Sequence, residues 1–256
     1  MKSCAVQDRI YIIGDDDNLE WTHLVEYNTR TNIWRTLSSF ECRSDSLCAG
    51  FLFYVGNKLY IDEMIDEMID HDEDVDHMSI CIYSKALDSL DDEDEKWKQI
   101  KVNVDDDFFD LSVAVEDECI YLVGGKCEIE KYDVRQDLWT IVTQLPDEMC
   151  RHYTAVAVLD GKIYVSDGVS FQCYDTSTEN WTSLARMNHD RSNCYLRLSL
   201  LVKNGSLVVV GGDAIEEYDV ANDTWTVKVE NLVDYPEDAL VMMKYYFWTE
   251  VIDGPA

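Results

Sequence analysis

The residues in this sequence that could carry out chemistry are mainly histidines and arginines, which lie close together in two places. His152 follows Arg151, and His189 stands two residues before Arg191. An imidazole can transfer protons near neutral pH, and a guanidinium can bind a carboxylate or a phosphate through paired donors. The sequence contains no nucleophile elbow, phosphate-binding loop, His-Glu-x-x-His motif or spaced Cys/His set. We therefore predict no catalytic residue, no metal site and no cofactor.

An acidic segment, residues 61–77, could also bind a ligand, because it holds nine carboxylates and no Lys or Arg. A calcium loop would need Gly at position six and Glu at position twelve, where this chain has Val75 and Cys81. We interpret the segment as a solvated loop, since like charges repel one another. Three alternatives stay open: a short helix with apolar residues on one side, a transition-metal site at His71 and His77, and a docking strip for a basic partner. The nine carboxylates are Asp62, Glu63, Asp66, Glu67, Asp70, Asp72, Glu73, Asp74 and Asp76.

The composition limits the class of protein. Apolar residues make up 46% of the chain, enough for a sizeable core. The net charge of −31 argues against nucleic acid and anionic membranes as partners, because both would repel the chain. We find no apolar run of about 18 residues and no signal-peptide pattern. Nine scattered cysteines without CxxC spacing favour a reducing compartment, so we predict a cytoplasmic location.

The elements that must position these residues form a sequence repeat. A Tyr is followed seven residues later by a Trp in four copies, at Tyr27–Trp34, Tyr132–Trp139, Tyr174–Trp181 and Tyr218–Trp225. In a fifth copy, Tyr83–Trp97, the step is fourteen residues. This copy also contains the acidic segment, which stands where a loop between its second and third strands would be. Repeats of this length indicate an architecture built from similar units.

Each copy has the pattern of four short strands. Runs such as "IYLV", "IYVS" and "LVVV" are rich in β-branched residues and are followed by glycines, which allow backbone conformations that other residues avoid. The pairs Asp160-Gly161 and Asn204-Gly205 suit tight hairpins, so we expect antiparallel meanders. One meander cannot bury both of its faces, whereas copies packed around an axis form a β-propeller with aromatic residues in its core. The structural residues of the repeat are Gly124, Gly125, Tyr132, Trp139, Tyr174, Trp181, Gly211, Gly212, Tyr218 and Trp225.

We therefore predict an all-β fold, a single β-propeller over residues 1–256 made of four-stranded antiparallel blades. Five repeats are recognisable, and a partial sixth follows them. The expected blades are roughly residues 3–40, 49–104, 111–145, 153–187 and 197–231, with the partial sixth at 237–251.

These motifs resemble the kelch repeat. The resemblance rests on the Gly-Gly pairs, the spaced Trp and the Tyr-Asp pairs at Tyr132, Tyr174 and Tyr218. The stretch "RHYTAVAVLDGKIYVSDG", which begins at Arg151, is especially similar to the kelch-like proteins of animals. The resemblance extends over nearly the whole chain. Kelch-like propellers usually have six blades, so residues 237–251 either begin a sixth blade or complete a ring of five.

The resemblance implies a function in protein recognition. In kelch-like proteins, the loops between blades and those between second and third strands form the face that grips a partner. Such propellers recognise substrates within adaptors of cullin-RING ubiquitin ligases. That role needs a BTB region, for which these 256 residues show no pattern, so the chain is either a fragment or a module that does not recruit a ligase. The implied contact residues are Arg43, Arg151, His152, Tyr153, His189, Arg191 and Asn193.

Other interpretations compete with this one. The arginines could instead brace neighbouring blades through ion pairs with the many carboxylates. An actin-associated kelch scaffold is the alternative function, although actin is itself acidic and the charge of −31 disfavours direct binding. A propeller enzyme is a weaker alternative, because the repeated box of sialidases is absent. We therefore predict a non-enzymatic module that binds a protein partner, and a partner with a basic segment would suit its charge.

Overall fold

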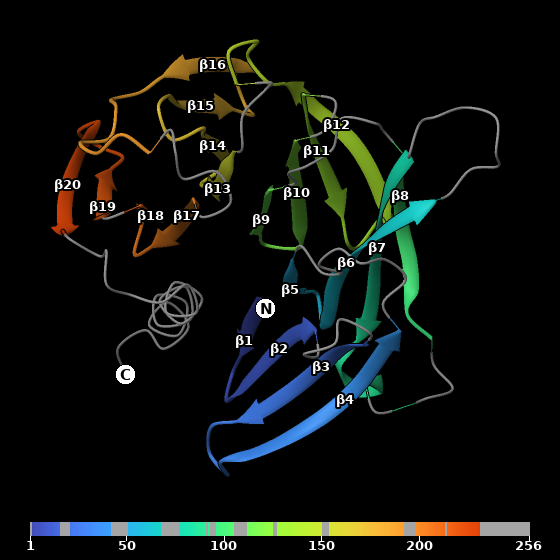
Figure 1. Ribbon diagram of the computed structural model, residues 1–256. Coiled ribbons are helices and arrows are strands. Elements are labelled where there is room, and N and C mark those ends of the chain that lie inside the picture. The colour runs from blue at the N-terminus through green and yellow to red at the C-terminus, as the bar shows by residue number, and fades with distance from the viewer. Residues whose placement is uncertain are drawn as a thin grey trace. The chain divides into compact units, whose positions relative to one another are not determined.

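The computed structural model describes residues 2–15, 21–41, 51–67, 77–90, 92, 96–104, 112–124, 127–149, 154–191, 198–212 and 214–230. The chain divides into two compact units, the first including residues 1–108 and the second formed by residues 109–247. Each unit consists of four-stranded antiparallel sheets, five in all (Figure 1). In every sheet the strands follow one another in sequence order, as expected for meanders.

The first unit contains two sheets, which we call blade one and blade two. In blade two, a 3-10 helix at Leu87–Ser89 follows the third strand. The strands of blade one are β1 (Lys2–Val6), β2 (Arg9–Asp15), β3 (Trp21–Asn28) and β4 (Ile33–Glu41). Those of blade two are β5 (Leu52–Val55), β6 (Lys58–Glu67), β7 (His77–Ala86) and β8 (Lys98–Val104).

The second unit contains blades three, four and five. Blade three consists of β9 (Ser112–Glu116), β10 (Cys119–Gly124), β11 (Glu128–Asp133) and β12 (Leu138–Gln144). Blade four consists of β13 (Ala155–Leu159), β14 (Lys162–Ser166), β15 (Phe171–Asp175) and β16 (Asn180–Ser183). Blade five consists of β17 (Ser199–Lys203), β18 (Ser206–Gly211), β19 (Ala214–Asp219) and β20 (Thr224–Val229).

The prediction of an all-β fold with four-stranded antiparallel propeller blades is confirmed. The five repeats correspond to the five sheets, and the partial sixth blade at 237–251 lies outside the described residues. Within the described part of the chain, no helix is long and apolar enough to cross a membrane.

In the repeats with the seven-residue spacing, the Tyr and Trp face one another across two neighbouring strands, whereas in blade two Tyr83 pairs with Gln99. Tyr132 pairs with Trp139, Tyr174 with Trp181, and Tyr218 with Trp225 in the strand register, and the ring centroids of these pairs lie 4.9, 5.3 and 5.0 Å apart. All three tyrosines are buried, as predicted for core residues. The seven-residue spacing therefore encodes a cross-strand aromatic pair, which stabilises an antiparallel sheet.

Polar residues stabilise the turn between the Tyr and the Trp of a repeat. In blade five, one carboxylate oxygen of Asp219 accepts hydrogen bonds from the backbone N–H groups of Ala221 and Asn222. The hydroxyl of Tyr218 donates to Asp223, whose backbone has a positive φ of 51°. Asp and Asn tolerate this left-handed conformation and bond to their own turn, which explains their place here.

The core lies between neighbouring blades. In the second unit, one apolar cluster joins blades three and four, and includes Val123, Ile129 and Ile163. A second cluster joins blades four and five, and includes Tyr164, Phe171 and Val209. Blade four therefore buries apolar residues on both faces, as a single meander could not do.

The expectation that the acidic segment is a loop from residue 61 onward is wrong for residues 61–67. These residues belong to β6, which pairs with β7 from Lys58↔Ala86 to Glu67↔His77. The helical alternative is wrong for the same residues. In this register the acidic residues of β6 pair with Ile82, Cys81, Met78 and His77. The like charges on which the loop prediction rested therefore do not prevent strand pairing here.

Candidate functional site

The structure describes two of the seven predicted contact residues. His189 and Arg191 lie in the segment 184–191, which leaves β16 and leads from blade four toward blade five. The other five, Arg43, Arg151, His152, Tyr153 and Asn193, lie outside the described residues. Among the carboxylates of the acidic segment, Asp62, Glu63, Asp66 and Glu67 belong to β6, whereas Asp70, Asp72, Glu73, Asp74 and Asp76 lie outside the described residues.

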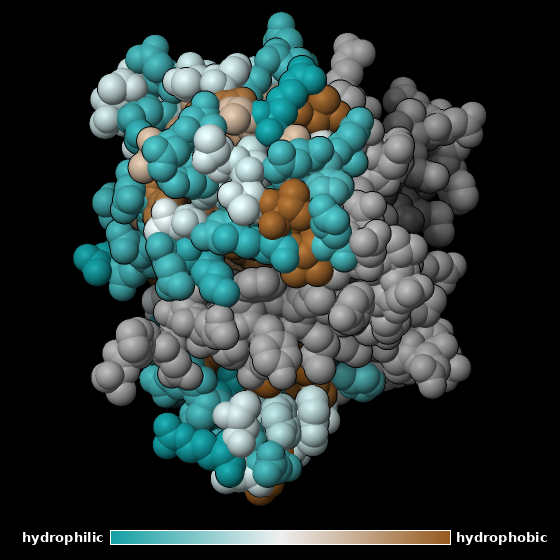
Figure 2. Space-filling view, turned by 90° about the vertical axis from the view of Figure 1, so that its left-hand side faces the viewer, coloured by the Kyte–Doolittle hydropathy of each residue, from teal (hydrophilic) through white to brown (hydrophobic). Residues whose placement is uncertain are grey.

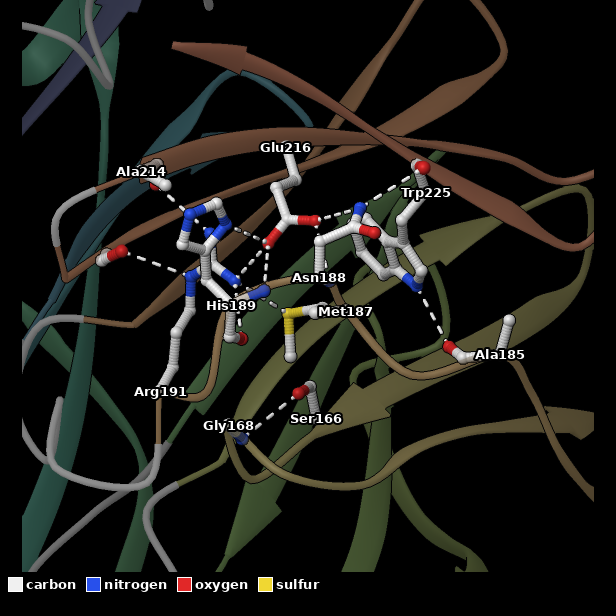
Figure 3. A network of polar contacts seen from close by, with 11 residues as sticks. Ser166, Gly168, Ala185, Met187, Asn188, His189, Arg191, Ala214, Glu216 and Trp225 are labelled. Carbon is white, nitrogen blue, oxygen red and sulfur yellow. Dashed lines mark hydrogen bonds and ion pairs between the residues drawn. The ribbon is translucent and has the colours of Figure 1, made fainter. Parts of the chain in front are cut away.

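A network of polar contacts surrounds the two described candidates (Figure 3). We call it the Glu216 cluster, and it consists of Asn188, His189, Arg191 and Glu216. Glu216 is on β19, where its side chain is buried completely, and it lies on the same side of the strand as Tyr218. Its carboxylate accepts hydrogen bonds from the backbone N–H groups of Asn188 and His189 at 2.8 and 3.0 Å. The side-chain amide of Asn188 donates a further hydrogen bond of 2.7 Å.

Arg191 is the cation of this cluster. Its Nη1 lies 2.6 Å from Glu216 Oε1, and only 1% of its side chain is exposed. Its remaining donors bond to backbone carbonyls: Nε to Gly211, Nη1 also to His189, and Nη2 to Ala214. The guanidinium therefore ties the segment 184–191 to the turn between β18 and β19.

The backbone of Arg191 is fixed as closely as its side chain. Its N–H donates to the carbonyl of Gly168 at 3.0 Å, in the turn between β14 and β15. Gly168 has a φ of +87°, and a Cβ at this position would lie 2.6 Å from the Arg191 carbonyl oxygen. Only glycine combines this backbone conformation with so close an approach. The Asp167-Gly168 pair of the sequence, which replaces the double glycine of other copies, thus has a packing role.

The electrostatics of the cluster favour a charged Glu216. Burial raises the pKa of this carboxyl group, but the ion pair with Arg191 and the donors of Asn188 and His189 lower it by more. The net result is a pKa of about 2 in place of 4.5. Glu216 therefore stays ionised at neutral pH and is a poor general base, because such a base needs a pKa near the working pH.

For Arg191 the arrangement favours the bracing alternative, which the sequence left open beside a contact role. Its side chain is buried and uses its donors within the protein, so it takes the bracing role that the sequence left as the alternative. His189 differs, because 29% of its side chain is exposed while its Nδ1 lies 3.3 Å from Glu216 Oε1. Within the described cluster, His189 is thus the predicted contact residue that a partner could touch, next to the exposed Asn188.

Blade four carries a simpler form of the same arrangement. Gln172 stands two residues before Tyr174, as Glu216 stands two residues before Tyr218. Its buried side chain donates to Glu148, in the segment that leaves blade three. Sequence reasoning missed this position, although a polar residue two places before the repeat Tyr, on its buried side, was a usable signal.

A second buried carboxylate lies in blade one, where Glu26 pairs with Arg9 at 2.9 Å and with Arg35 at 3.3 Å. Within the ranges given above, no group of three or more His, Cys, Asp or Glu side chains could hold a metal ion. On the face shown in Figure 2, described residues are mainly hydrophilic, and the hydrophobic ones form small separate patches.

Comparisons with known proteins agree with the repeat and the fold. The family model of the Kelch motif matches residues 150–188, which contain blade four and most of the segment 184–191. Residues 150–188 thus match the Kelch motif. Over 154 residues it is 25% identical to Kelch-like protein 23 of Pongo abelii, a match that covers 52% of this chain and 26% of that protein. Over 127 residues it is 28% identical to Kelch repeat and BTB domain-containing protein 8 of Danio rerio, covering 43% and 20%.

The chain thus resembles kelch-like proteins, but it spans only about a quarter or less of the length of these curated relatives. Among solved structures, a protein of unknown function from Bacteroides thetaiotaomicron has a TM-score of 0.54 at 12% identity, covering 90% of this chain and 58% of that chain. The extracellular domain of a putative one-component system from the same organism has a TM-score of 0.56 at 13% identity, covering 89% and 28%. At such identities the likeness concerns the fold alone.

Proposed function

We propose that this chain is a non-enzymatic protein-recognition module. The observation that supports this most directly is the Glu216 cluster, where the conspicuous charged groups of a kelch repeat serve to fix an inter-blade segment. The donors of Arg191 bind backbone carbonyls and a carboxylate, and Glu216 stays ionised. The cluster therefore holds the segment 184–191 in place and is unsuited to acid–base chemistry. Loops held by a rigid scaffold are suited to binding.

The finer proposal is that the module recognises substrates for a cullin-RING ubiquitin ligase in the reducing environment of the cytoplasm. Its support is the resemblance to kelch-like proteins, one of which carries a BTB domain in its name. Because the matches cover 26% and 20% of those relatives, the ligase-binding part of such an adaptor corresponds to regions beyond the matched ones. The candidate contact residues Arg43, Arg151, His152, Tyr153, His189 and Asn193 belong to this proposal.

A basic partner segment is the second part of the proposal. The chain has a net charge of −31, and five carboxylates of the acidic segment fall between Glu67 and His77, the last residues paired by β6 and β7. An acidic segment of this charge would attract Lys/Arg-rich surfaces of a partner and would speed the association of that partner with the chain at low salt.

Proximity labelling in cells tests these proposals. Deleting residues 61–77 is unsuitable for this test, because it would remove part of β6. The better variant, which we call the neutralised variant, keeps the chain length and removes the charge of the five carboxylates between Glu67 and His77. Its substitutions are Asp70→Asn, Asp72→Asn, Glu73→Gln, Asp74→Asn and Asp76→Asn. A matched control neutralises five exposed carboxylates elsewhere, by Asp117→Asn, Asp147→Asn, Asp160→Asn, Glu179→Gln and Glu230→Gln.

Each outcome of the labelling bears on one part of the proposal. Recovery of a cullin with the full chain supports the adaptor role, and its reproducible absence argues against it. Loss of basic partners with the neutralised variant, but not with the control, supports docking at the acidic segment. Equal partner sets for both variants would remove that docking role and leave the recognition role of the other loops to be tested by His189→Ala.

A further inference from the structure

The last strand of each sheet forms one of its two edges, because the strands follow one another in sequence order. Among the described residues, the backbone N–H and C=O groups on the outer side of this strand have no partner strand. Such an edge can pair with another extended chain, and proteins usually prevent this with charged side chains or with a very short edge strand. The five last strands can be compared for this protection.

Four of the five last strands are protected in one of these two ways. β4 carries Arg35, β8 carries Lys98 and β20 carries Lys228. β16 has only four residues. By contrast, β12 has seven residues and no Asp, Glu, Lys or Arg, although 29% of the chain is charged. The edge of blade three is therefore the one that lacks protection.

This edge also exposes apolar side chains. Leu138 is 51% exposed and Ile141 is 61% exposed, and Thr140 between them is exposed as well. Leu138 and Ile141 are three residues apart on the strand, so their side chains lie on opposite faces of the sheet. An added strand would thus find main-chain hydrogen-bonding groups along its length and an apolar contact on each face.

We propose that β12 is a docking edge, where an extended segment of a partner protein adds to blade three as a further strand. The charges beside the edge indicate the chemistry of this segment, because the neighbouring strand β11 carries three carboxylates and one lysine. These residues are Glu128, Glu130, Asp133 and Lys131. Two of the carboxylates lie toward the ends of the strand pair, with Asp133 opposite Leu138 and Glu128 opposite Gln144. The segment therefore has β-branched residues at its centre and Lys or Arg at its ends.

The net charge favours a different protein over a second copy of this chain. Two copies that each carry a net charge of −31 repel one another, whereas a basic segment is attracted. The docking edge involves neither the acidic segment nor His189, so this proposal goes beyond the proposed function. Its failure would leave the roles proposed for those residues unchanged.

A pool of synthetic peptides tests the proposal on the full chain. Each peptide is about nine residues long, with two lysines at each end and a centre varied among valine, isoleucine and threonine. Fluorescence anisotropy measures binding, and hydrogen exchange followed by mass spectrometry locates it. We expect the bound peptides to slow the exchange of N–H groups within residues 138–144 at least about tenfold.

A second pool tests whether binding uses the main chain. Its peptides have the same sequences, but every central residue carries an N-methyl group. This change removes the main-chain donors of the centre and keeps its side chains and the charge of the peptide. Because strand addition depends on main-chain hydrogen bonds, we expect the methylated peptides to bind at least about tenfold more weakly.

A double variant of the chain tests the edge itself. Leu138→Lys with Ile141→Lys gives β12 the protection that other last strands have, and both sites are exposed, so the fold should persist. The matched control, Val169→Lys with Val229→Lys, adds the same charge at two other exposed apolar sites of the second unit. We expect the edge variant to bind the first pool at least about tenfold more weakly than the control does. Equal urea midpoints for the two variants show that both are folded.

Five results would overturn the proposal. The first is that no peptide of the first pool binds at ~1 mM. The second is that methylated peptides bind as tightly as the others, so that side chains or charge alone are recognised. The third is that the slowed N–H groups lie outside residues 138–144, and the fourth is that the edge variant and the control bind equally. The fifth is that exchange within 138–144 slows with protein concentration alone, which would make a second copy of the chain the occupant.

Discussion

Arg191 and Glu216 form an ion pair in which Nη1 and Oε1 are 2.6 Å apart and both side chains are almost fully withdrawn from solvent. The two residues are 25 positions apart in sequence, and the pair joins the segment leaving blade four to β19 of blade five. Burying two charges is costly, and here the cost is offset by backbone donors to the carboxylate and backbone carbonyls around the guanidinium. The pair is therefore a cross-link between neighbouring blades.

Removing the charge of Glu216 should destabilise the second unit. With Glu216→Gln, Arg191 stays buried without its counter-ion, and breaking such a pair typically costs ~3 to 5 kcal/mol. Urea unfolding followed by tryptophan fluorescence measures this loss. The control is Glu217→Gln, whose carboxylate is partly exposed and paired with Lys228, and which should change the free energy of unfolding by less than about 1 kcal/mol. Similar losses for both variants would argue against a special role for the buried pair.

The stability of the second unit should fall in acid. Because the folded-state pKa of Glu216 is about 2 and its ordinary value is 4.5, the ionised carboxylate stabilises the fold above pH 4.5, and this contribution is lost as the pH falls toward 2. A shift of this size corresponds to ~3 kcal/mol. Urea midpoints measured between pH 5 and pH 2 should fall more steeply in the unaltered chain than in Glu216→Gln. Parallel curves for the two proteins would contradict the prediction.

Gly168→Ala should be more harmful than a similar change elsewhere. Gly168 and Gly205 have φ angles of +87° and +78°, so alanine at either position meets backbone strain of ~1 to 2 kcal/mol. At Gly168 the new Cβ would also lie 2.6 Å from the Arg191 carbonyl oxygen, whereas at Gly205 nothing lies within 4 Å. The difference in unfolding free energy between the two variants isolates the contact. We expect Gly168→Ala to lose at least ~1 kcal/mol more, because overpacking costs that much.

Asp223 should tolerate asparagine but not alanine. One of its carboxylate oxygens accepts hydrogen bonds of 2.8 Å from the Tyr218 hydroxyl and from the backbone N–H of Ala185, which leaves blade four. Asp223→Asn keeps an acceptor at this place and the tolerance of a positive φ, so its effect on stability should be small. Asp223→Ala leaves both donors without their acceptor and should cost ~1 to 3 kcal/mol. Thermal unfolding of both variants distinguishes them, and an equal effect would show that the negative charge of Asp223, not its acceptor oxygen, is what matters.

The sequence predicted the parts of the fold that depend on neighbouring residues. The spacing of Tyr174 and Trp181 corresponds to two strands and a four-residue turn, and the turn is stabilised by Asp175, whose side chain accepts from Ser177 and Thr178. The hairpin pairs Asp160-Gly161 and Asn204-Gly205 adopt the positive φ values expected of them. These features are local, so they can be recognised from spacing and residue type.

The tertiary structure decided what depends on burial and on distant partners. By itself the sequence placed Arg191 on a binding face or in an ion pair with equal weight, because a guanidinium serves both, and only the packing of Glu216 behind it selects the second. The acidic residues 61–67 could not be assigned to β6 from their own charge, because strand formation there also involves pairing with β7. The sequence by itself thus determined the repeat and the strands within each blade, since these depend on local spacing. The structure determined which charged residues are buried and paired, since the free energy of a charge depends on surroundings that distant segments supply.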